Sequence, residues 1–175
     1  MKNSIQMIIS ATQIRKRIIE LGQQITSNYK NSQQNMVLVG LLKGSFIFIA
    51  DLCRCINIEH EIDFMTISSY GNNTVTNMNV KILKDLNQDV CGKNVLIIED
   101  IIDSGNTWFK VREIIKSKKP HSLAICTLLN KTKSRDISIH IDYTGFYISN
   151  DFVVGYGIDY AQYYRSLPYI AKVIF

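Results

Sequence analysis

The sequence predicts an α/β fold built on a mainly parallel sheet, and three observations support this prediction. The segments Met36–Leu42, Val95–Ile98 and Ser122–Leu129 are almost uninterrupted apolar runs, which is typical of strands buried on both faces. Two segments of helical character, Phe46–Ile56 and Trp108–Lys118, separate these runs along the chain. Strands that alternate with helices in this way form parallel sheets that are covered by helices on both sides.

The remaining segments extend this pattern toward both ends of the chain. Isoleucine and leucine recur at helical spacing from Ile14 to Ile25, and Ser10 is suited to cap that helix. The polar segment Ser69–Val80 has no period and predicts a long mobile loop. Further strands are expected at Glu61–Ser68, Val80–Leu83, Tyr143–Ile148, Phe152–Tyr156 and Tyr169–Phe175.

Length and composition indicate a single globular domain spanning residues 1–175. The chain is 46% hydrophobic and 20% charged, which excludes disorder, collagen and coiled coil as the main class. Its longest apolar runs fall far short of the roughly 20 residues that cross a bilayer. The first residues, Met1–Gln6, lack the apolar core of a signal peptide. We therefore expect a cytoplasmic protein without a membrane partner.

Cysteine, histidine and net charge argue against several classes of site. The four cysteines form no CxxC pair and the three histidines show no ligand spacing, so we expect reduced thiols and no zinc site. The net charge of +5 is mild and suits an anionic substrate. The lysines of the segment Lys116–Lys119 fit a solvated helix end better than a nucleic-acid surface, so no nucleic-acid partner is expected.

The segment Val95–Thr107 carries the clearest chemical signal in the chain. A buried strand is followed by the acids Glu99, Asp100 and Asp103 and then by a small-residue turn at a helix start. Such a turn suits a phosphate group, because glycine permits close approach and the first helical N–H groups are free. The turn consists of Ser104, Gly105, Asn106 and Thr107.

Acids beside a phosphate site need a reason, and a Mg²⁺ ion or a sugar with vicinal hydroxyls supplies one. The plainer alternative makes Asp103 a helix cap and leaves Glu99 and Asp100 as solvated loop residues. No Gly-Lys-Ser/Thr or Gly-x-Gly-x-x-Gly pattern occurs at this loop, so it is neither a Walker A loop nor a dinucleotide fingerprint.

These residues resemble the phosphoribosyl pyrophosphate (PRPP) motif of the type I phosphoribosyltransferases. The likeness extends over nearly the whole chain, and within that family it favours the bacterial hypoxanthine branch. Besides the acidic loop, the segments that carry it are Leu41–Ser45, Ser68–Gly71, Lys131 and Asp151–Tyr160.

The resemblance implies a parallel-sheet domain with a small hood formed by the chain ends. It implies Mg²⁺-dependent transfer of phosphoribosyl from PRPP to hypoxanthine and guanine, which yields IMP, GMP and pyrophosphate. It also implies a homodimer or homotetramer and a cis peptide bond between Leu42 and Lys43.

The resemblance further assigns roles to individual residues. Asp103 is the expected general base at purine N7, and Ser69 and Tyr70 belong to a mobile lid. Metal ligation is expected from Glu99, Asp100 and Asp159. The expected purine contacts are Lys131, Phe152, Val153, Ile158 and Asp159. The expected PRPP and phosphate contacts are Lys43, Gly44, Glu99, Asp100, Asp103, Ser104, Gly105, Asn106, Thr107 and Arg165.

Alternatives remain open at this point. Taken alone, Lys43 fits an exposed loop lysine, Phe152 fits a core aromatic, and the Ser69–Asn79 segment fits an ordinary surface loop. A relative that prefers xanthine or guanine would carry nearly the same motifs. A regulator that senses PRPP and binds nucleic acid would need a continuous basic face or an added domain, and neither is visible in the sequence.

Overall fold

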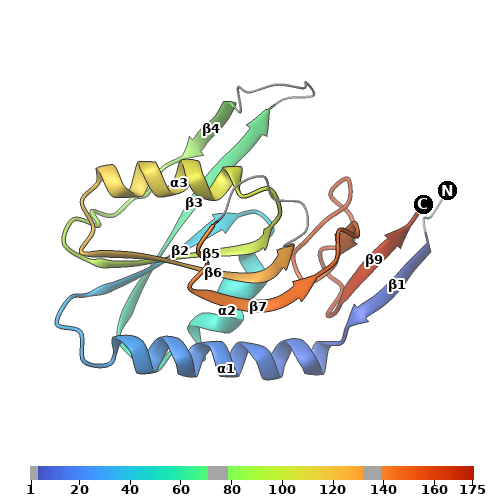
Figure 1. The fold of residues 1–175 in the computed structure, drawn as a ribbon, viewed down its shortest axis with the longest axis horizontal. Helices are drawn as coiled ribbons and strands as arrows, with labels where there is room; N and C mark the ends of the chain where they lie inside the picture. The colour runs from blue at the N-terminus through green and yellow to red at the C-terminus, as the bar shows by residue number, and fades with distance from the viewer. Residues whose placement is uncertain (1–3, 71–78, 132–138) are drawn as a thin grey trace.

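A six-stranded sheet occupies the centre of the described part of the computed structural model, which comprises residues 4–70, 79–131 and 139–175 (Figure 1). Its strands are β2 (Met36–Leu42), β3 (His60–Tyr70), β4 (Asn79–Lys84), β5 (Asn94–Ile102), β6 (Ser122–Lys131) and β7 (Tyr143–Ile148). The strand order is β4-β3-β2-β5-β6-β7, and only the edge pair β3–β4 of these described strands is antiparallel. The predicted α/β class with a mainly parallel sheet is confirmed.

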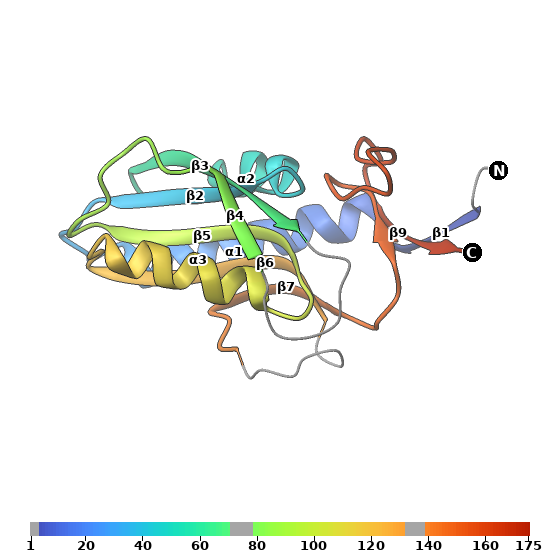
Figure 2. The same cartoon turned by 90° about the horizontal axis from the view of Figure 1, so that it is seen from above.

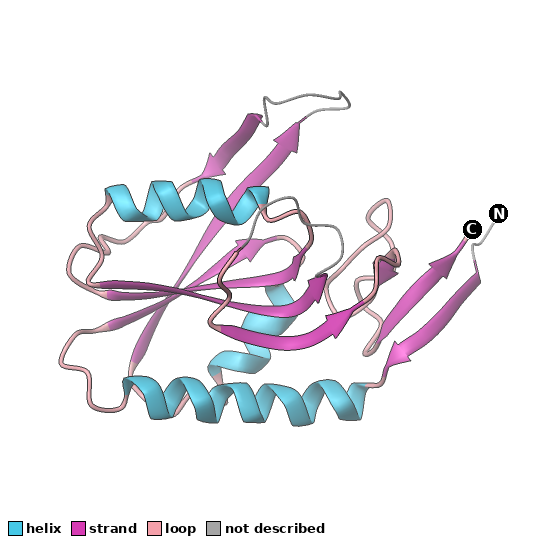
Figure 3. Ribbon diagram, viewed as in Figure 1, coloured by secondary structure: helices cyan, strands magenta, loops and turns pink. Residues whose placement is uncertain are grey.

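Three helices cover the two faces of this sheet within the described residues. α1 (Ala11–Tyr29) and α2 (Phe46–Cys53) lie on one face, and α3 (Asn106–Ser117) lies on the other (Figures 1 and 3). Ser10 caps α1 in a reciprocal capping box with Gln13, as the sequence predicts. None of the described helices combines the length and apolar composition required to cross a bilayer.

The central strands β2 and β5 are buried on both faces, which explains their continuous apolar runs. Successive side chains point to opposite layers, so Leu38 and Leu96 pack in the core beneath α1 and α2. Their neighbours Val39 and Ile97 pack instead in the core beneath α3. The sheet therefore has no solvated face at its centre, and its strand ends are the accessible polar positions.

A second, antiparallel sheet stands beyond the carboxyl ends of the parallel strands (Figures 1 and 2). It consists of β1 (Ser4–Ile9), β9 (Ile170–Ile174) and β8 (Val153–Val154), in that order. We call this sheet, together with residues 149–169, the hood. The two chain ends pair here, with Ile5 opposite Val173. The sequence patterns did not predict β1, because a short strand that pairs only with the far end of the chain has no local signal.

Several predicted boundaries were wrong. β5 runs four residues further than predicted, through Glu99 and Asp100 to Ile102, because its pairing with β6 continues beyond the apolar run. The helix predicted over Phe46–Ile56 ends at Cys53. The predicted loop Ser69–Val80 is shorter, because β3 extends to Tyr70 and β4 begins at Asn79; residues 71–78 lie outside the described part.

Asp63 of β3 is a buried carboxylate that secures the connection after β4. Its side chain is 4% exposed, and Oδ1 accepts the backbone N–H of Phe64 at 2.7 Å. Oδ2 accepts the backbone N–H groups of Asn87 at 2.7 Å and Gln88 at 3.1 Å. Burial raises the pKa of Asp63, but these donors and the charge of Lys84 outweigh it, so the pKa lies below 3.8.

We predict that Asp63→Asn lowers the free energy of unfolding at pH 7 by about 1–3 kcal/mol, because charge-assisted hydrogen bonds are lost. A folded-state pKa below the unfolded value stabilises the fold above pH ~4, and this contribution is lost as the pH falls through the lower folded value. Urea denaturation at pH 7 and pH 3 measures both effects, and the difference from the parent should shrink at pH 3. The matched control is Asp89→Asn, an exposed aspartate that accepts the backbone N–H of Cys91.

Candidate active site

Four segments from distant parts of the chain meet at the carboxyl ends of the parallel strands. They are the connection after β2, the end of β5 with the turn into α3, the end of β6, and the hood from residue 149 to β9 (Figure 2). Open α/β sheets bind ligands at this edge, because the loops there diverge and leave a crevice. All the predicted site residues except Ser69 and Tyr70 lie on these segments.

Gly44 lies where three of these segments touch. A Cβ atom on Gly44 would stand 1.9 Å from Oδ2 of Asp100, and a Cβ on Gly157 would stand 2.2 Å from the carbonyl oxygen of Gly44. The peptide bond between Leu42 and Lys43 is cis, as the resemblance implies. Only glycine permits contacts this close, so the backbone after β2 is brought directly against the acids of β5 and against the hood.

Glu99 and Asp100 form a partly buried pair of carboxylates near the end of β5. Burial raises the pKa of Glu99 well above its usual value, and the charge of Asp100 raises it further. Burial also raises the pKa of Asp100 from 3.8 to about 6, against the opposing effects of backbone N–H groups and of Arg165. The negative charge of Asp159 contributes to the same rise. A cation bound beside this pair would relieve the cost of ionising it.

Arg165 and Asp159 are joined within the hood. Nη2 of Arg165 forms an ion pair with Oδ1 of Asp159 at 2.7 Å, and Nη1 donates to the carbonyl oxygen of Gly157 at 2.8 Å. The backbone N–H of Gln162 donates to Oδ2 of Asp159 at 2.8 Å. Both oxygens of this predicted metal ligand therefore have hood partners, and its charge is balanced by the arginine predicted to bind pyrophosphate.

The turn from β5 into α3 has the geometry expected of a phosphate site. Gly105 is the N-cap of α3 with φ of +88°, so the cap position has no side-chain oxygen to accept the first helical N–H groups. Asn106 Nδ2 donates to Oγ of Ser104 at 2.8 Å, which orders the turn. The alternative reading of Asp103 as the helix cap is wrong, because the cap lies two residues later.

Asp103 and Lys131 come together from the ends of neighbouring strands. Nζ of Lys131 lies 3.1 Å from Oδ2 of Asp103. The lysine side chain is 9% exposed, whereas the aspartate side chain is 50% exposed. Since lysine side chains are rarely buried to this degree without a partner, the position of the Lys131 ammonium is set by neighbouring protein groups and not by solvent. The predicted base and the predicted purine O6 donor therefore lie side by side at the carboxyl ends of β5 and β6.

Phe152 stands at the edge of the hood in an aromatic group that sequence reasoning missed. It is 44% exposed, which excludes the alternative of a core aromatic. Its ring makes edge contacts with Tyr160 at a centroid distance of 5.4 Å and with Phe175 at 5.9 Å. The neighbouring Val153 and Ile158, both predicted purine contacts, are buried. No local pattern links Tyr160 and Phe175 to Phe152, because the hood fold alone brings them together.

The remaining predicted residues, Ser69 and Tyr70, are those of the predicted lid. The backbone of Ser69 and Tyr70 is part of β3, where these residues pair with Val80 and Asn79 of β4. The rest of the predicted lid, residues 71–78, lies outside the described part of the chain.

The acids of the site fit a shared metal ion better than a complete protein cage. Among the described residues, no group of three or more histidine, cysteine or acidic side chains is arranged to hold a metal. Mg²⁺ is commonly held by one or two carboxylates together with substrate phosphates, and it keeps several water molecules. Glu99 and Asp100 meet that requirement, since they are adjacent, oxygen-bearing and costly to ionise alone.

Comparison with known proteins agrees with this geometry. The sequence profile described as a phosphoribosyl transferase domain matches residues 5–161. The chain belongs to the phosphoribosyltransferase family. This phosphoribosyltransferase is 59% identical over 174 residues to the hypoxanthine phosphoribosyltransferase of Escherichia coli (strain K12), and the match covers 99% of this chain and 98% of that protein. The expected resemblance to this family and its fold is confirmed.

Solved structures resemble this phosphoribosyltransferase over its whole length. The hypoxanthine-guanine phosphoribosyltransferase of Bacillus anthracis has a TM-score of 0.92 and 43% identity, with 99% of this chain and 100% of that chain covered. The hypoxanthine phosphoribosyl transferase of Trypanosoma cruzi, studied for the role of its C-terminal region on oligomeric state and enzymatic activity, has a TM-score of 0.93 and 34% identity, with 99% and 93% covered.

We predict that Asp100→Asn stabilises the ligand-free phosphoribosyltransferase while abolishing most of its activity. The folded-state pKa of about 6 exceeds the unfolded value of 3.8, so ionisation of Asp100 lowers stability progressively as the pH rises from about 4 to 6. The amide avoids this cost, which amounts to about 3 kcal/mol at pH 7 for a shift from 3.8 to about 6. Urea denaturation at pH 7 and pH 4 measures the gain, which should vanish at pH 4.

The control is Glu113→Gln, which removes one negative charge at an exposed position of α3. A stability gain as large in this control as in Asp100→Asn would assign the effect to net charge and not to burial.

Proposed function

We propose that this phosphoribosyltransferase joins hypoxanthine, and more slowly guanine, to PRPP and releases pyrophosphate. The products are IMP and GMP, so the reaction salvages free purines, and we place it in the cytoplasm. The observation that supports this choice of base most directly is the contact between Lys131 and Asp103 at 3.1 Å, because it puts a donor for a 6-oxo group beside a proton acceptor. The high identity to a hypoxanthine phosphoribosyltransferase supports the same assignment.

The phosphate end of PRPP fits the turn from β5 into α3. Its 5′-phosphate would accept hydrogen bonds from the uncapped N–H groups of the first helical turn and from the hydroxyls of Ser104 and Thr107. Gly105 keeps this turn open at φ of +88°. The positive end of the α3 dipole adds to the attraction for the anion.

The ribose and pyrophosphate would lie between the acids of β5 and the connection after β2. Glu99 and Asp100 would accept hydrogen bonds from the ribose hydroxyls and hold Mg²⁺ with the substrate, and Asp159 would provide a further metal contact. When bound, Mg²⁺ supplies positive charge to the pyrophosphate as its bond to the sugar breaks. Lys43 and Gly44 would bind pyrophosphate through their backbone, and Arg165 would bind it through its guanidinium fork.

The purine would enter between the hood and the end of β6. Phe152 would stack on the base, while Val153, Ile158 and the carbonyl oxygen of Asp159 would line its edge. Lys131 would donate to O6, and Asp103 would take the proton from N7 as N9 bonds to the anomeric carbon. An adenine 6-amino group offers no acceptor to Lys131, so it would leave a buried cation badly paired.

Closure and assembly complete the proposal. Ser69 and Tyr70 would bring the lid over the reacting centre, which keeps water from hydrolysing the activated ribose. The protein is proposed to act as a homodimer or homotetramer, and sedimentation equilibrium measures which of the two forms.

The reaction is tested by supplying PRPP and Mg²⁺ with hypoxanthine, guanine, xanthine or adenine in separate assays. We expect rapid formation of IMP, slower formation of GMP and no product from adenine. Rapid product formation with xanthine, and with none of the other bases, would contradict the proposed preference for hypoxanthine. Binding of PRPP without turnover of any base would reject the transferase proposal in favour of a PRPP sensor, and nucleic-acid binding would then be measured at physiological salt.

We predict that Asp103→Asn lowers kcat by about 10²–10⁴-fold, because the amide cannot accept the purine proton. PRPP affinity, measured by calorimetry, should change little, since the N–H groups of the α3 turn remain. The matched control is Asp85→Asn, which breaks an aspartate–lysine pair of similar length, 2.8 Å to Lys118, away from the crevice. Unchanged kcat at saturating substrates would remove Asp103 from the role of base.

We predict that Lys131→Met reduces kcat/KM for hypoxanthine by about 10–100-fold and lowers the preference for hypoxanthine over adenine. Methionine keeps an aliphatic stem in this buried position and removes only the charged donor. Lys118→Met provides the comparison, because it removes the lysine of an ion pair outside the crevice. An unchanged ratio of hypoxanthine to adenine use would argue against the O6 contact.

A further inference from the structure

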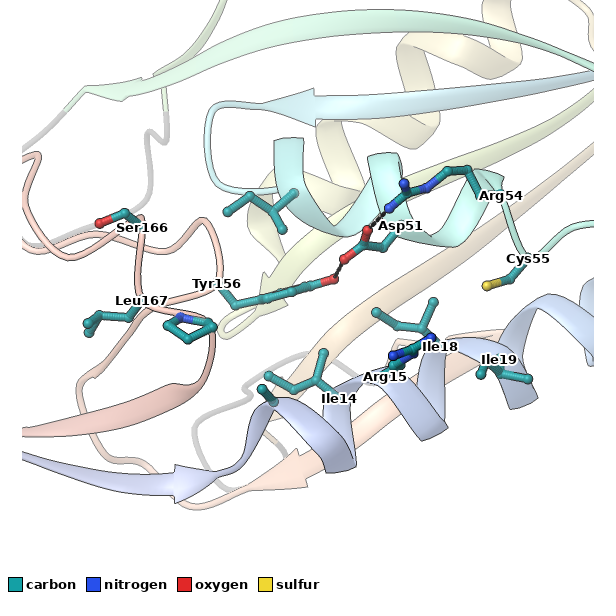
Figure 4. A pocket seen from close by; sticks show the side chains of 13 residues that line it. Ile14, Arg15, Ile18, Ile19, Asp51, Arg54, Cys55, Tyr156, Ser166 and Leu167 are labelled. Carbon is teal, nitrogen blue, oxygen red and sulfur yellow. Dashed lines mark hydrogen bonds and ion pairs between the residues drawn. The ribbon is translucent and has the colours of Figure 1, made fainter.

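A hydrogen bond links the hood to α2. The phenol hydroxyl of Tyr156 donates to Oδ2 of Asp51 in α2, and Oδ1 of Asp51 is paired with Arg54 (Figure 4). Tyr156 is 6% exposed, whereas Arg54 is 73% exposed at its side chain. The buried partner is therefore the tyrosine, and the arginine is a solvated neighbour of the carboxylate.

The backbone around Tyr156 is unusual. Gly155, Tyr156 and Gly157 have φ of +102°, +49° and +100°, so three successive residues occupy the left-handed region. For a residue with a side chain this conformation costs about 1–2 kcal/mol and needs compensating contacts. The backbone N–H of Tyr156 donates to Leu167 at 2.8 Å, and that of Gly157 donates to Arg165 at 2.9 Å. The hydrogen bond from the Tyr156 hydroxyl to Asp51 adds a side-chain contact to these two backbone hydrogen bonds.

The Tyr156 ring belongs to the buried core and also borders a cavity. The ring and Asp51 border a cavity of about 660 Å³ between α1, α2 and the hood (Figure 4). Much of the remaining lining is aliphatic and includes Ile14, Ile18 and Ile47. Beside this space, the hydroxyl–carboxylate bond adds a directional restraint to the packing that already buries the ring.

The hood thus contacts the β2–α2 unit at two points. Gly157 rests on the carbonyl oxygen of Gly44, and the adjacent Tyr156 binds Asp51, which lies in the second turn of the helix that begins at Phe46. Gly44 belongs to the proposed pyrophosphate loop. Two contacts made by consecutive residues set both the distance and the rotation of the hood relative to that loop.

We propose that Tyr156 and Asp51 are positioning residues that hold the purine-binding segment of the hood in register with the pyrophosphate loop. The inference rests on the proposed function, because it takes the purine to lie along Val153–Asp159 and the pyrophosphate at Gly44. Neither residue touches a substrate in this proposal. Tyr156 and Asp51 act through the backbone of Gly157, whose carbonyl oxygen accepts from the guanidinium of Arg165 at 2.8 Å.

The test compares Tyr156→Phe with Tyr143→Phe. Tyr143 of β7 is also 6% exposed, and its phenol oxygen accepts a hydrogen bond from Nδ2 of Asn28 at 2.7 Å, so both variants remove one buried phenol contact. kcat and KM are measured for hypoxanthine and for PRPP well below the melting temperature of each variant. We expect both variants to melt at a lower temperature, whereas only Tyr156→Phe should lose about tenfold in kcat/KM, mainly through higher KM for both substrates.

Variants of the partner separate positioning from general destabilisation. Asp51→Asn keeps an oxygen that accepts from Tyr156, so its kcat/KM should lie within about threefold of the parent value. Asp51→Ala removes that oxygen, so its loss in kcat/KM should match that of Tyr156→Phe. In the double variant, Asp51→Ala should cause little further loss in kcat/KM beyond that of Tyr156→Phe, because both substitutions remove the same hydrogen bond. Arg54→Ala should leave both KM values unchanged. If Tyr156→Phe fails to fold, Asp51→Ala with the tyrosine intact carries the test.

Equal kcat/KM in Tyr156→Phe and Tyr143→Phe, or additive losses in the double variant, would overturn the inference. Failure of the proposed function is recognised separately, because the parent protein would then form no IMP. In that case the melting temperatures of the double variant still report whether Tyr156 and Asp51 are coupled, and additive shifts would overturn the hood contact itself.

Discussion

The structure depends on the pairing of two buried parallel strands, β2 and β5. Their register places Gly40 opposite Ile98, and each strand is covered on both faces by apolar layers, so a slip of one residue would expose a core side chain on each. With this register, the chain leaving β2 arrives at Gly44 directly beside Asp100. The close approach of the Gly44 backbone, which we propose binds pyrophosphate, to Asp100 is therefore a consequence of how the core is packed.

Without substrate, two carboxylates of the site lie where their ionisation is unfavourable. Glu99 and Asp100 are costly to ionise where they lie, as their raised pKa values indicate, and the charge of Arg165 favours ionisation of Asp100. Lys131 contacts Asp103 at the same edge of the sheet. An anionic sugar phosphate with its metal ion would bring charges of both signs to these groups, so binding energy and charge balance would be obtained together.

Much of the fold was predictable, because its signals are local. The α1 helix follows from a repeat of aliphatic residues with a capping serine, and β2 follows from an unbroken apolar run. The acids and small residues of Val95–Thr107 indicated the site, and the family resemblance supplied their roles. The end of β5 was misjudged because glutamate and aspartate disfavour strands, yet the ladder to β6 carries them through Ile102.

The sequence by itself determined the fold class, the strand–turn–helix unit that suits a phosphate and the family of the protein. These properties depend on periodicity and on motifs whose residues are close together in the chain. Only the tertiary structure decided that β1 pairs with β9, that Lys131 meets Asp103, and that Tyr156 binds Asp51. Each of these contacts joins residues far apart in sequence, and the angle between the hood and the sheet, which no local pattern encodes, sets whether the hood residues reach their partners.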